Sequence, residues 1–186
     1  MTIITTKGQI TEHFNGNEFK CKCGCGQINI DKEFVQRLEK LYATLDKIPS
    51  GVKAIYINSG YRCAKQSQNI KGAFIGDMHN IGAAADIHAQ SKNGSYIDSI
   101  TICEAAQLCG FGGIAIIDDY NAHVDDRQRG DITYQNKQWY GNESTGANVT
   151  TFIGKSKYTN YLNKKSNQVY IEIMIDDHKY SGLLSE

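Results

Sequence analysis

The chain has 186 residues, of which 20 are Lys or Arg and 20 are Asp or Glu, so its formal net charge is zero. This balance leaves no electrostatic footprint for nucleic acid or for an anionic membrane surface, and we expect neither class of partner. The length suits one domain with its own core plus a small appendage, and we expect a monomer. The first residues are too polar for a signal peptide and no apolar run could span a membrane, so we expect synthesis in the cytoplasm without a leader.

The N-terminal stretch 8–30 alternates polar, Gly and Cys residues without periodicity, and we expect a loop region that packs over the domain. The six cysteines of the chain are too few for a disulfide scaffold at this length, and a cytoplasmic origin favours reduced thiols. Cys21, Cys23 and Cys25 could bind a structural zinc ion with Cys63 as the fourth ligand. Zinc sites usually have C-x2-C or longer spacing, so the C-x-C-x-C spacing favours a reduced, partly buried thiol cluster instead.

An amphipathic helix is predicted to begin after Asp31, a residue type suited to the N-cap, and to end at Pro49. Its apolar positions follow the spacing of one helix face and are Phe34, Leu38, Leu41, Leu45 and Ile48. A short β-type run over 53–58 comes next and ends in a turn that carries Arg62. An Arg in that place is either a solvated charge or reaches into a cleft, where its planar fork can hold a carboxylate or a polarised carbonyl oxygen.

Residues 64–75 are polar and are predicted to form a loop that leads into the stretch 76–87, which reads G-D-M-H-N-I-G-A-A-A-D-I. This stretch sets an imidazole, His79, and a carboxylate, Asp86, on either side of a run of small residues. Imidazole nitrogen and carboxylate oxygen are both zinc ligands, and a catalytic zinc keeps one position open for water. A strand here would point Asp86 and His88 to one face, and we read His88 as exposed in preference to orienting a ligand.

A second helix is predicted over 98–109, and a hairpin with a buried first strand over 111–125. Because side chains alternate along a strand, the returning strand of this hairpin would point His123 and Asp125 the same way. His123 is therefore the candidate for the third metal ligand.

After the main domain, the composition of the chain predicts a linker and a small tail. Packing signals weaken after Arg127, and the stretch 141–155 is rich in Gly, Asn, Ser and Thr, which predicts a flexible linker. Alternating apolar residues and a turn at Asp176-Asp177 predict a small β-hairpin tail within 156–186, of unknown role. The main domain is therefore expected to span 1–140.

Four segments stand in the order and at the spacing of the M15 family of zinc peptidases, which the chain resembles over about residues 9–130. They are Ile57-Asn-Ser-Gly-Tyr-Arg-Cys63, His79-x2-Gly82-x-Ala84-x-Asp86-Ile87, Gly110-Phe-Gly-Gly-Ile114 and His123-Val-Asp125-x-Arg127. Four ordered motifs are far more specific than any one of them. The resemblance is strongest to the short branch found in phage endolysins and bacterial cell-wall enzymes.

The resemblance implies an α+β fold, with a small antiparallel sheet and flanking helices that carry a zinc site, as in Hedgehog and D,D-peptidase domains. It implies a Zn2+-dependent hydrolase that cuts peptidoglycan peptides, as an endopeptidase or a D,D-carboxypeptidase. His79, Asp86 and His123 match the three zinc ligands, and Arg62 matches the Arg that faces the substrate. Asp125 matches an acid beside the third ligand, either as the general base that takes the proton of water or as a residue that orients the site.

One departure and several alternatives remain. Family members commonly have Ser two residues before the first His, whereas this chain has Asp77, which adds negative charge near the metal. The bond that is cut is open between L-Ala to D-Glu, a cross-bridge and a terminal D-Ala. A non-catalytic, metal-containing wall-binding or phage structural module is the alternative to an enzyme. Without a leader, the protein is expected to reach the cell wall only after its release.

Overall fold

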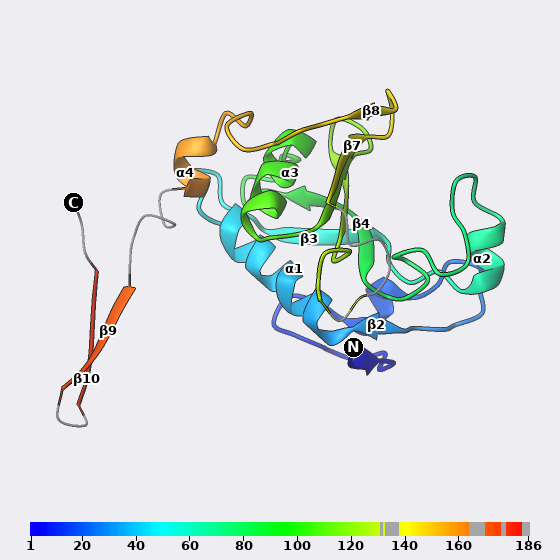
Figure 1. The fold of residues 1–186 in the computed structure, drawn as a ribbon, viewed down its shortest axis with the longest axis horizontal. Coiled ribbons are helices and arrows are strands. Elements are labelled where there is room, and N and C mark those ends of the chain that lie inside the picture. The colour runs from blue at the N-terminus through cyan, green and yellow to red at the C-terminus, as the bar shows by residue number, and fades with distance from the viewer. Residues whose placement is uncertain (131, 133–137, 164–169, 176–177, 184–186) are drawn as a thin grey trace.

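The computed structural model describes residues 1–130, 132, 138–163, 170–175 and 178–183. Within these ranges, a central sheet is packed against two longer helices, and several short elements surround them (Figure 1). The chain is therefore α+β, as the sequence predicts. None of the described helices is long and apolar enough to cross a membrane.

Helix α1 (Lys32–Leu45) begins at the predicted N-cap. The Asp31 side chain accepts hydrogen bonds from the backbone N–H groups of Glu33 and Phe34. These bonds satisfy two of the N–H groups that every helix start leaves unpaired. The predicted apolar face is fully buried at Phe34, Leu38, Leu41 and Leu45. Burial of each such side chain contributes about 1.5–3 kcal/mol, which holds α1 against the sheet.

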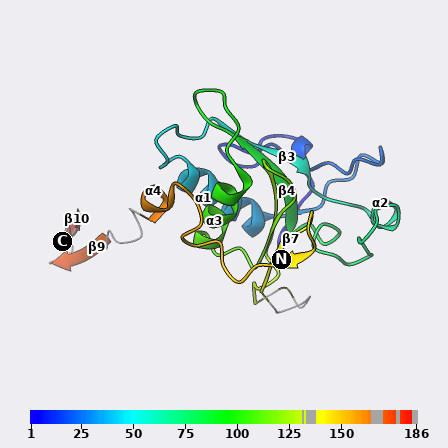
Figure 2. The ribbon, with the colours of Figure 1, turned by 90° about the horizontal axis from the view of Figure 1, so that it is seen from above.

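Helix α3 (Ser99–Leu108) covers the same side of the sheet as α1, as both views show (Figures 1 and 2). Asp98 caps its start by accepting a hydrogen bond from the backbone N–H of Thr101 at 2.8 Å. Buried Ile102 and Ala106 join the same core cluster as the face of α1. The two helices therefore close one face of the sheet.

Among the described residues, six strands form the main sheet. In spatial order they are β3 (Ala54–Ser59), β4 (Ala84–Gln90), β6 (Asn121–Asp125), β5 (Gly113–Ile116), β7 (Trp139–Asn142) and β8 (Ala147–Asn148). The paired strands run antiparallel except β5 and β7, which run parallel. The sheet is therefore mostly antiparallel, as the family resemblance implied, with one parallel pair between β5 and β7.

The two faces of this sheet have different chemistry. Ala85 and Ile87 of β4 and Val124 of β6 point into the core that α1 and α3 cover. Because side chains alternate along a strand, Asp86 and His123 stand on the opposite face. The helices thus stabilise one face of the sheet and leave the other for polar groups.

Two stretches differ from expectation. The predicted loop 64–75 includes a short helix, α2 (Ala64–Gln68), which is too short and polar to give an apolar pattern. The stretch 141–155 is not a flexible linker in the structure, because part of β7 and all of β8 lie within it and Phe152 is only 1% exposed. Several of the Gly, Asn, Ser and Thr residues of this stretch form turns next to strands β7 and β8.

The N-terminal stretch packs over the domain as predicted. Strands β1 (Ile3–Ile4) and β2 (Ile30–Asp31) pair with each other, and the 3-10 helix η1 (Gly16–Phe19) lies between them in the chain. Phe14, Phe19 and Ile30 are fully buried in the main core. This stretch is therefore part of the core.

The C-terminal region contains α4 (Thr159–Asn163) and a separate antiparallel hairpin of β9 (Tyr170–Ile175) and β10 (His178–Leu183). The hairpin agrees with the predicted tail. The predicted turn residues Asp176-Asp177 lie outside the described residues.

Candidate metal centre

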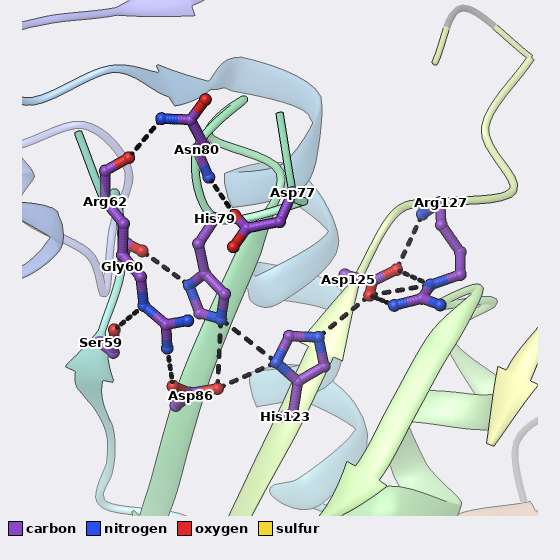
Figure 3. Close-up of polar contacts among 10 residues, drawn as sticks. All are labelled: Ser59, Gly60, Arg62, Asp77, His79, Asn80, Asp86, His123, Asp125 and Arg127. Carbon is purple, nitrogen blue, oxygen red and sulfur yellow. Dashed lines mark hydrogen bonds and ion pairs between the residues drawn. The ribbon is translucent and has the colours of Figure 1, made fainter. Parts of the chain in front are cut away.

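Three side chains from distant parts of the chain converge on the polar face of the sheet (Figure 3). The Asp86 Oδ1 atom lies 2.9 Å from His123 Nδ1 and 3.3 Å from His79 Nε2. The same two imidazole nitrogens lie 3.3 Å from each other. We call His79, Asp86 and His123 the His–Asp centre; they are the three residues that the sequence nominated as ligands.

The strand register explains why two of these groups meet. Asp86 of β4 is directly opposite His123 of β6 in the antiparallel pair. Side chains opposite each other on one face of such a pair have Cβ atoms about 4.5–5.5 Å apart, which brings their polar ends into contact. Ala115 of β5 lies beside His123 on its other side, and its small side chain leaves room for the imidazole ring.

His79 comes from the turn that precedes β4, and Asp77 shapes this turn. The Asp77 Oδ1 atom accepts a hydrogen bond from the backbone N–H of Asn80 at 2.7 Å, and Oδ2 accepts one from Phe74 at 3.3 Å. Gly82 then has a φ of 81°, a left-handed conformation that favours glycine. Asp77, the departure from the family pattern, therefore holds the loop that presents His79.

Each imidazole uses its second nitrogen to fix its orientation. His79 Nδ1–H donates to the Gly60 carbonyl oxygen at 2.8 Å, and His123 Nε2 lies 3.0 Å from Asp125 Oδ2. Ligating histidines in metalloproteins are held in this way by a carbonyl or a carboxylate, which sets the tautomer and raises the basicity of the other nitrogen. The His79 Nε2 and His123 Nδ1 atoms are thereby directed at Asp86.

Asp125 lies behind His123 and is fully buried. Arg127 binds it through its backbone N–H at 2.9 Å and through its guanidinium group at 2.6 Å. Gly113 faces Asp125 across the β5–β6 pair, and a side chain at Gly113 would collide with the carboxylate. Both oxygens of Asp125 are thus occupied by neighbours, and Asp125 does not line the cavity described below.

Arg62 lies on the other side of the centre. Its Nη2 donates to Asp86 Oδ2 at 2.6 Å, and its Nε donates to Ser59 Oγ at 3.1 Å. A β-bulge between Ile57 and Ser59 turns the end of β3 toward the centre. Arg62 therefore orients the carboxylate of Asp86 and also lines the cavity described below.

The charges of the centre favour a cation between the two carboxylates. Burial alone lowers the pKa of His123, but the hydrogen bonds and charges of Asp125 and Asp86 outweigh burial and raise this pKa to about 10. Burial raises the pKa of Asp86, yet His123 and His79 hold it well below its ordinary range. The pKa of Asp125 is likewise lowered to about 2 against the effect of burial. The two carboxylates therefore stabilise a proton on the His123 ring that lies between them.

A cavity of about 360 Å³ opens onto the centre, a size typical of small-molecule sites. The His–Asp centre forms part of its wall, together with Arg62, Lys71, Phe74, Asp77, Arg127, Trp139 and Glu143. Trp139 stacks under the Arg127 guanidinium at 4.8 Å and meets the His123 ring edge-on at 6.1 Å. From the sequence, Trp139 was considered as a groove residue, although lone aromatic residues are more often packing residues, and no pattern singled out Glu143.

A second cavity of about 560 Å³ lies on the other side of Asp86, which lines both cavities. Its walls include His88, Tyr96 and Tyr120. His88 is half-buried and donates from Nδ1 to Asn58 Oδ1 at 2.8 Å, so it neither belongs to the centre nor is fully exposed. Tyr61, also considered as a groove residue from the sequence, is buried in the core.

A His, Asp and His set on the open face of a sheet, beside a cavity, defines a candidate metal-dependent enzyme of α+β fold. The family model described as Peptidase M15 matches residues 12–125 of the chain, which therefore belongs to the M15 peptidase family, a family of metallopeptidases. This result confirms the resemblance found in the sequence. Neither a curated protein nor a solved structure matches the chain.

Proposed function

We propose that the protein is a zinc-dependent peptidase that hydrolyses peptide bonds in the stems or cross-links of bacterial peptidoglycan. The observation that carries this proposal is the convergence of His79 Nε2, Asp86 Oδ1 and His123 Nδ1 beside a cavity in an M15 family member. Two imidazoles and one carboxylate, each oriented by an outer hydrogen bond, are a donor set that suits catalytic zinc. When bound, zinc supplies Lewis acidity that lowers the pKa of water and polarises a carbonyl group.

Arg62 and Lys71 supply positive charge to the walls of the cavity. The stem peptides of peptidoglycan carry free carboxylates, and a planar guanidinium binds a carboxylate or a developing oxyanion through paired hydrogen bonds. Arg62 is placed for this role because only part of its guanidinium is used by Asp86 and Ser59. Arg62 and Lys71 can therefore bind a substrate carboxylate, although the same cavity also has acidic walls at Asp77, Asp86 and Glu143.

Asp125 serves as a positioning residue in this proposal. The sequence left it open between general base and orienting residue, and its complete burial behind His123 favours the second role. Its contact with Arg127 keeps the carboxylate charged, and the charged carboxylate holds the His123 ring.

Glu143 is then the better candidate to accept the proton of the attacking water. It lines the cavity and directly follows the last residue of β7. Asp77 lines the same cavity, but its two oxygens accept backbone hydrogen bonds from Asn80 and Phe74. A general base must reach the reacting water, and exposed Glu143 can do so without disrupting a turn.

The proposal is tested by incubation of the purified protein with purified cell walls, with new amine ends and loss of turbidity as the measurements. We expect zinc-dependent cleavage that a chelator stops and that His123→Ala lacks. Mass analysis of the released muropeptides identifies the bond that is cut. Unchanged walls at saturating zinc would contradict the enzyme and favour a wall-binding or phage structural module. Action on the wall after release from the cell is part of the same proposal.

A further inference from the structure

A second group of metal-ligating side chains lies outside the His–Asp centre. The sulfur atoms of Cys21, Cys23, Cys25 and Cys63, which we call the thiol cluster, all lie within 4.8 Å of one another. The Cys21 and Cys23 Sγ atoms are 3.4 Å apart, and those of Cys23 and Cys63 are 3.5 Å apart. Four sulfurs about 2.3 Å from one tetrahedral metal ion would be separated by about 3.8 Å. The cluster has the size that such a site requires.

The loop that carries the first three cysteines directs N–H groups at the sulfurs. The backbone N–H two residues further on donates toward the sulfur in each case, from Cys23 to Cys21, from Cys25 to Cys23 and from Gln27 to Cys25. The N–H of Cys63 also donates to Cys21 Sγ at 3.4 Å. Such N–H groups favour the charged, metal-binding form of a sulfur, while burial of Cys21 acts in the opposite direction.

Two glycines allow the close C-x-C-x-C spacing. Gly24 and Gly26 have φ angles of 86° and 76°, so the chain reverses after Cys23 and again after Cys25. The loop closes where the Cys21 N–H donates to the Gln27 carbonyl oxygen at 3.0 Å. From the sequence alone this spacing argued against a zinc site, but the folded loop brings three sulfurs to one side.

We propose that the thiol cluster binds one zinc ion as a structural tetrathiolate site, separate from the His–Asp centre. Four protein ligands close the coordination shell, so this ion stabilises structure and takes no part in hydrolysis. Soft thiolates select zinc over the hard cations calcium and magnesium.

The site would clamp the N-terminal loop onto the segment that serves the His–Asp centre. Cys63 directly follows Arg62, which binds Asp86. In the same segment, the Tyr61 N–H donates to the Phe19 carbonyl oxygen at 3.0 Å, and the Gly60 carbonyl oxygen holds His79. One zinc ion at the thiol cluster therefore fixes the position of Arg62 through the adjoining peptide bond.

The test is the zinc content of the purified full-length protein and of three variants. We expect two zinc ions per chain in the wild type, one in His79→Ala/His123→Ala, and one in Cys23→Ser/Cys25→Ser. Cys109→Ser is the matched control and should keep two, because Cys109 lies outside the cluster and contacts Thr44. An unchanged zinc content in Cys23→Ser/Cys25→Ser overturns the proposal. If the zinc content falls in Cys23→Ser/Cys25→Ser but not in His79→Ala/His123→Ala, the proposal is supported and zinc binding at the His–Asp centre is contradicted.

Cobalt gives a second readout that does not depend on the folding of a cysteine variant. His79→Ala/His123→Ala titrated with Co2+ should develop an intense thiolate-to-cobalt charge-transfer absorption that saturates at one equivalent. The four cluster thiols should then be protected from a thiol reagent, while Cys103 and Cys109 keep the reactivity they have without metal. Absence of the absorption band, or an intact mass that shows a disulfide within the cluster, overturns the proposal.

Discussion

The His–Asp centre and the thiol cluster differ in the elements that build them. The His–Asp centre takes Asp86 and His123 from two paired strands, whose register brings the side chains together, and it opens onto a cavity. The thiol cluster takes three ligands from a single loop stiffened by backbone hydrogen bonds. The first arrangement leaves room for a substrate, whereas the second surrounds an ion completely. The two proposed sites thus correspond to the two designs that separate catalytic from structural metal sites.

Loss of a ligand from the His–Asp centre should have the largest effect on activity. Asp86→Ala removes the carboxylate that both imidazoles contact. A bound metal contributes several kcal/mol to the transition state, so we expect activity to fall by about 10³-fold or more. His13→Ala is the control, because His13 lies at the surface against Glu39 and Tyr42. Cell-wall hydrolysis and the melting temperature are the measurements, and a fully active Asp86→Ala would exclude the centre.

Lowering the pH should reduce metal affinity more steeply at the thiol cluster than at the His–Asp centre. A thiol has an ordinary pKa of about 8.5 and must lose its proton to bind metal. Burial raises the pKa of Cys21 to about 12, and the N–H of Cys25 lowers that of Cys23 to about 7. At the His–Asp centre, the proton to be displaced is that of His123, whose pKa is raised to about 10. Protons compete with metal in both clusters, so both affinities fall as pH falls.

Metal binding should displace about three protons from the thiol cluster and about one from the His–Asp centre. Between pH 8 and pH 7 we therefore expect the metal affinity of the thiol cluster to fall by about 10³-fold and that of the His–Asp centre by about tenfold. Chelator competition on His79→Ala/His123→Ala and on Cys23→Ser/Cys25→Ser measures each cluster separately. Equal slopes would contradict the difference in ligand chemistry.

Replacement of Glu143 should affect catalysis without affecting metal content. Positioned general bases contribute about 10²-fold or more, so Glu143→Gln should lower kcat by at least about 10²-fold. The acid limb of the pH profile of kcat should disappear in this variant. Asp77→Asn is the comparison, and we expect it to retain the acid limb because Asp77 serves the turn. An unchanged kcat in Glu143→Gln would show that another group accepts the proton.

Asp125→Asn should have a smaller effect that zinc can rescue. Loss of an outer hydrogen-bond partner typically weakens metal affinity by about 10–100-fold. Hydrolysis at limiting zinc should therefore fall, and hydrolysis at saturating zinc should recover. If kcat at saturating zinc stayed about 10³-fold low, Asp125 would be the general base that the sequence also allowed.

Local patterns in the sequence predicted the elements that short-range rules control. The spacing of Phe34, Leu38 and Leu41 predicted helix α1, and Asp31 predicted where it begins. Both the apolar face and the N-cap of a helix depend on residues within one or two turns of each other. The hairpin carrying His123 followed from alternation and turn composition in the same way.

The features that the sequence missed depend on contacts across long separations. Trp139 and Glu143 reach the cavity because β7 pairs in parallel with β5, and a parallel partner cannot be read from local alternation. The burial of Asp125 depends on Gly113, which faces it only in the folded sheet, and on the side chain of Arg127, which folds back onto the carboxylate from two residues further on. The sequence could name Cys63 as a fourth ligand, but β2, α1 and β3 separate it from the other cluster cysteines, and only the fold brings its sulfur to 3.5 Å from that of Cys23.

Because β7 pairs with β5, the walls of the cavity come from two separate parts of the chain. Every residue of the His–Asp centre lies within 12–125, whereas Trp139 and Glu143 are contributed by residues after that range. Exchange of the segment 138–148 would therefore replace one wall around the substrate, together with Glu143 and with the Trp139 ring that meets His123, while all three ligand residues stay in the chain. We therefore expect substitutions in this segment that keep Glu143 to change which peptides are cut more than they change metal binding.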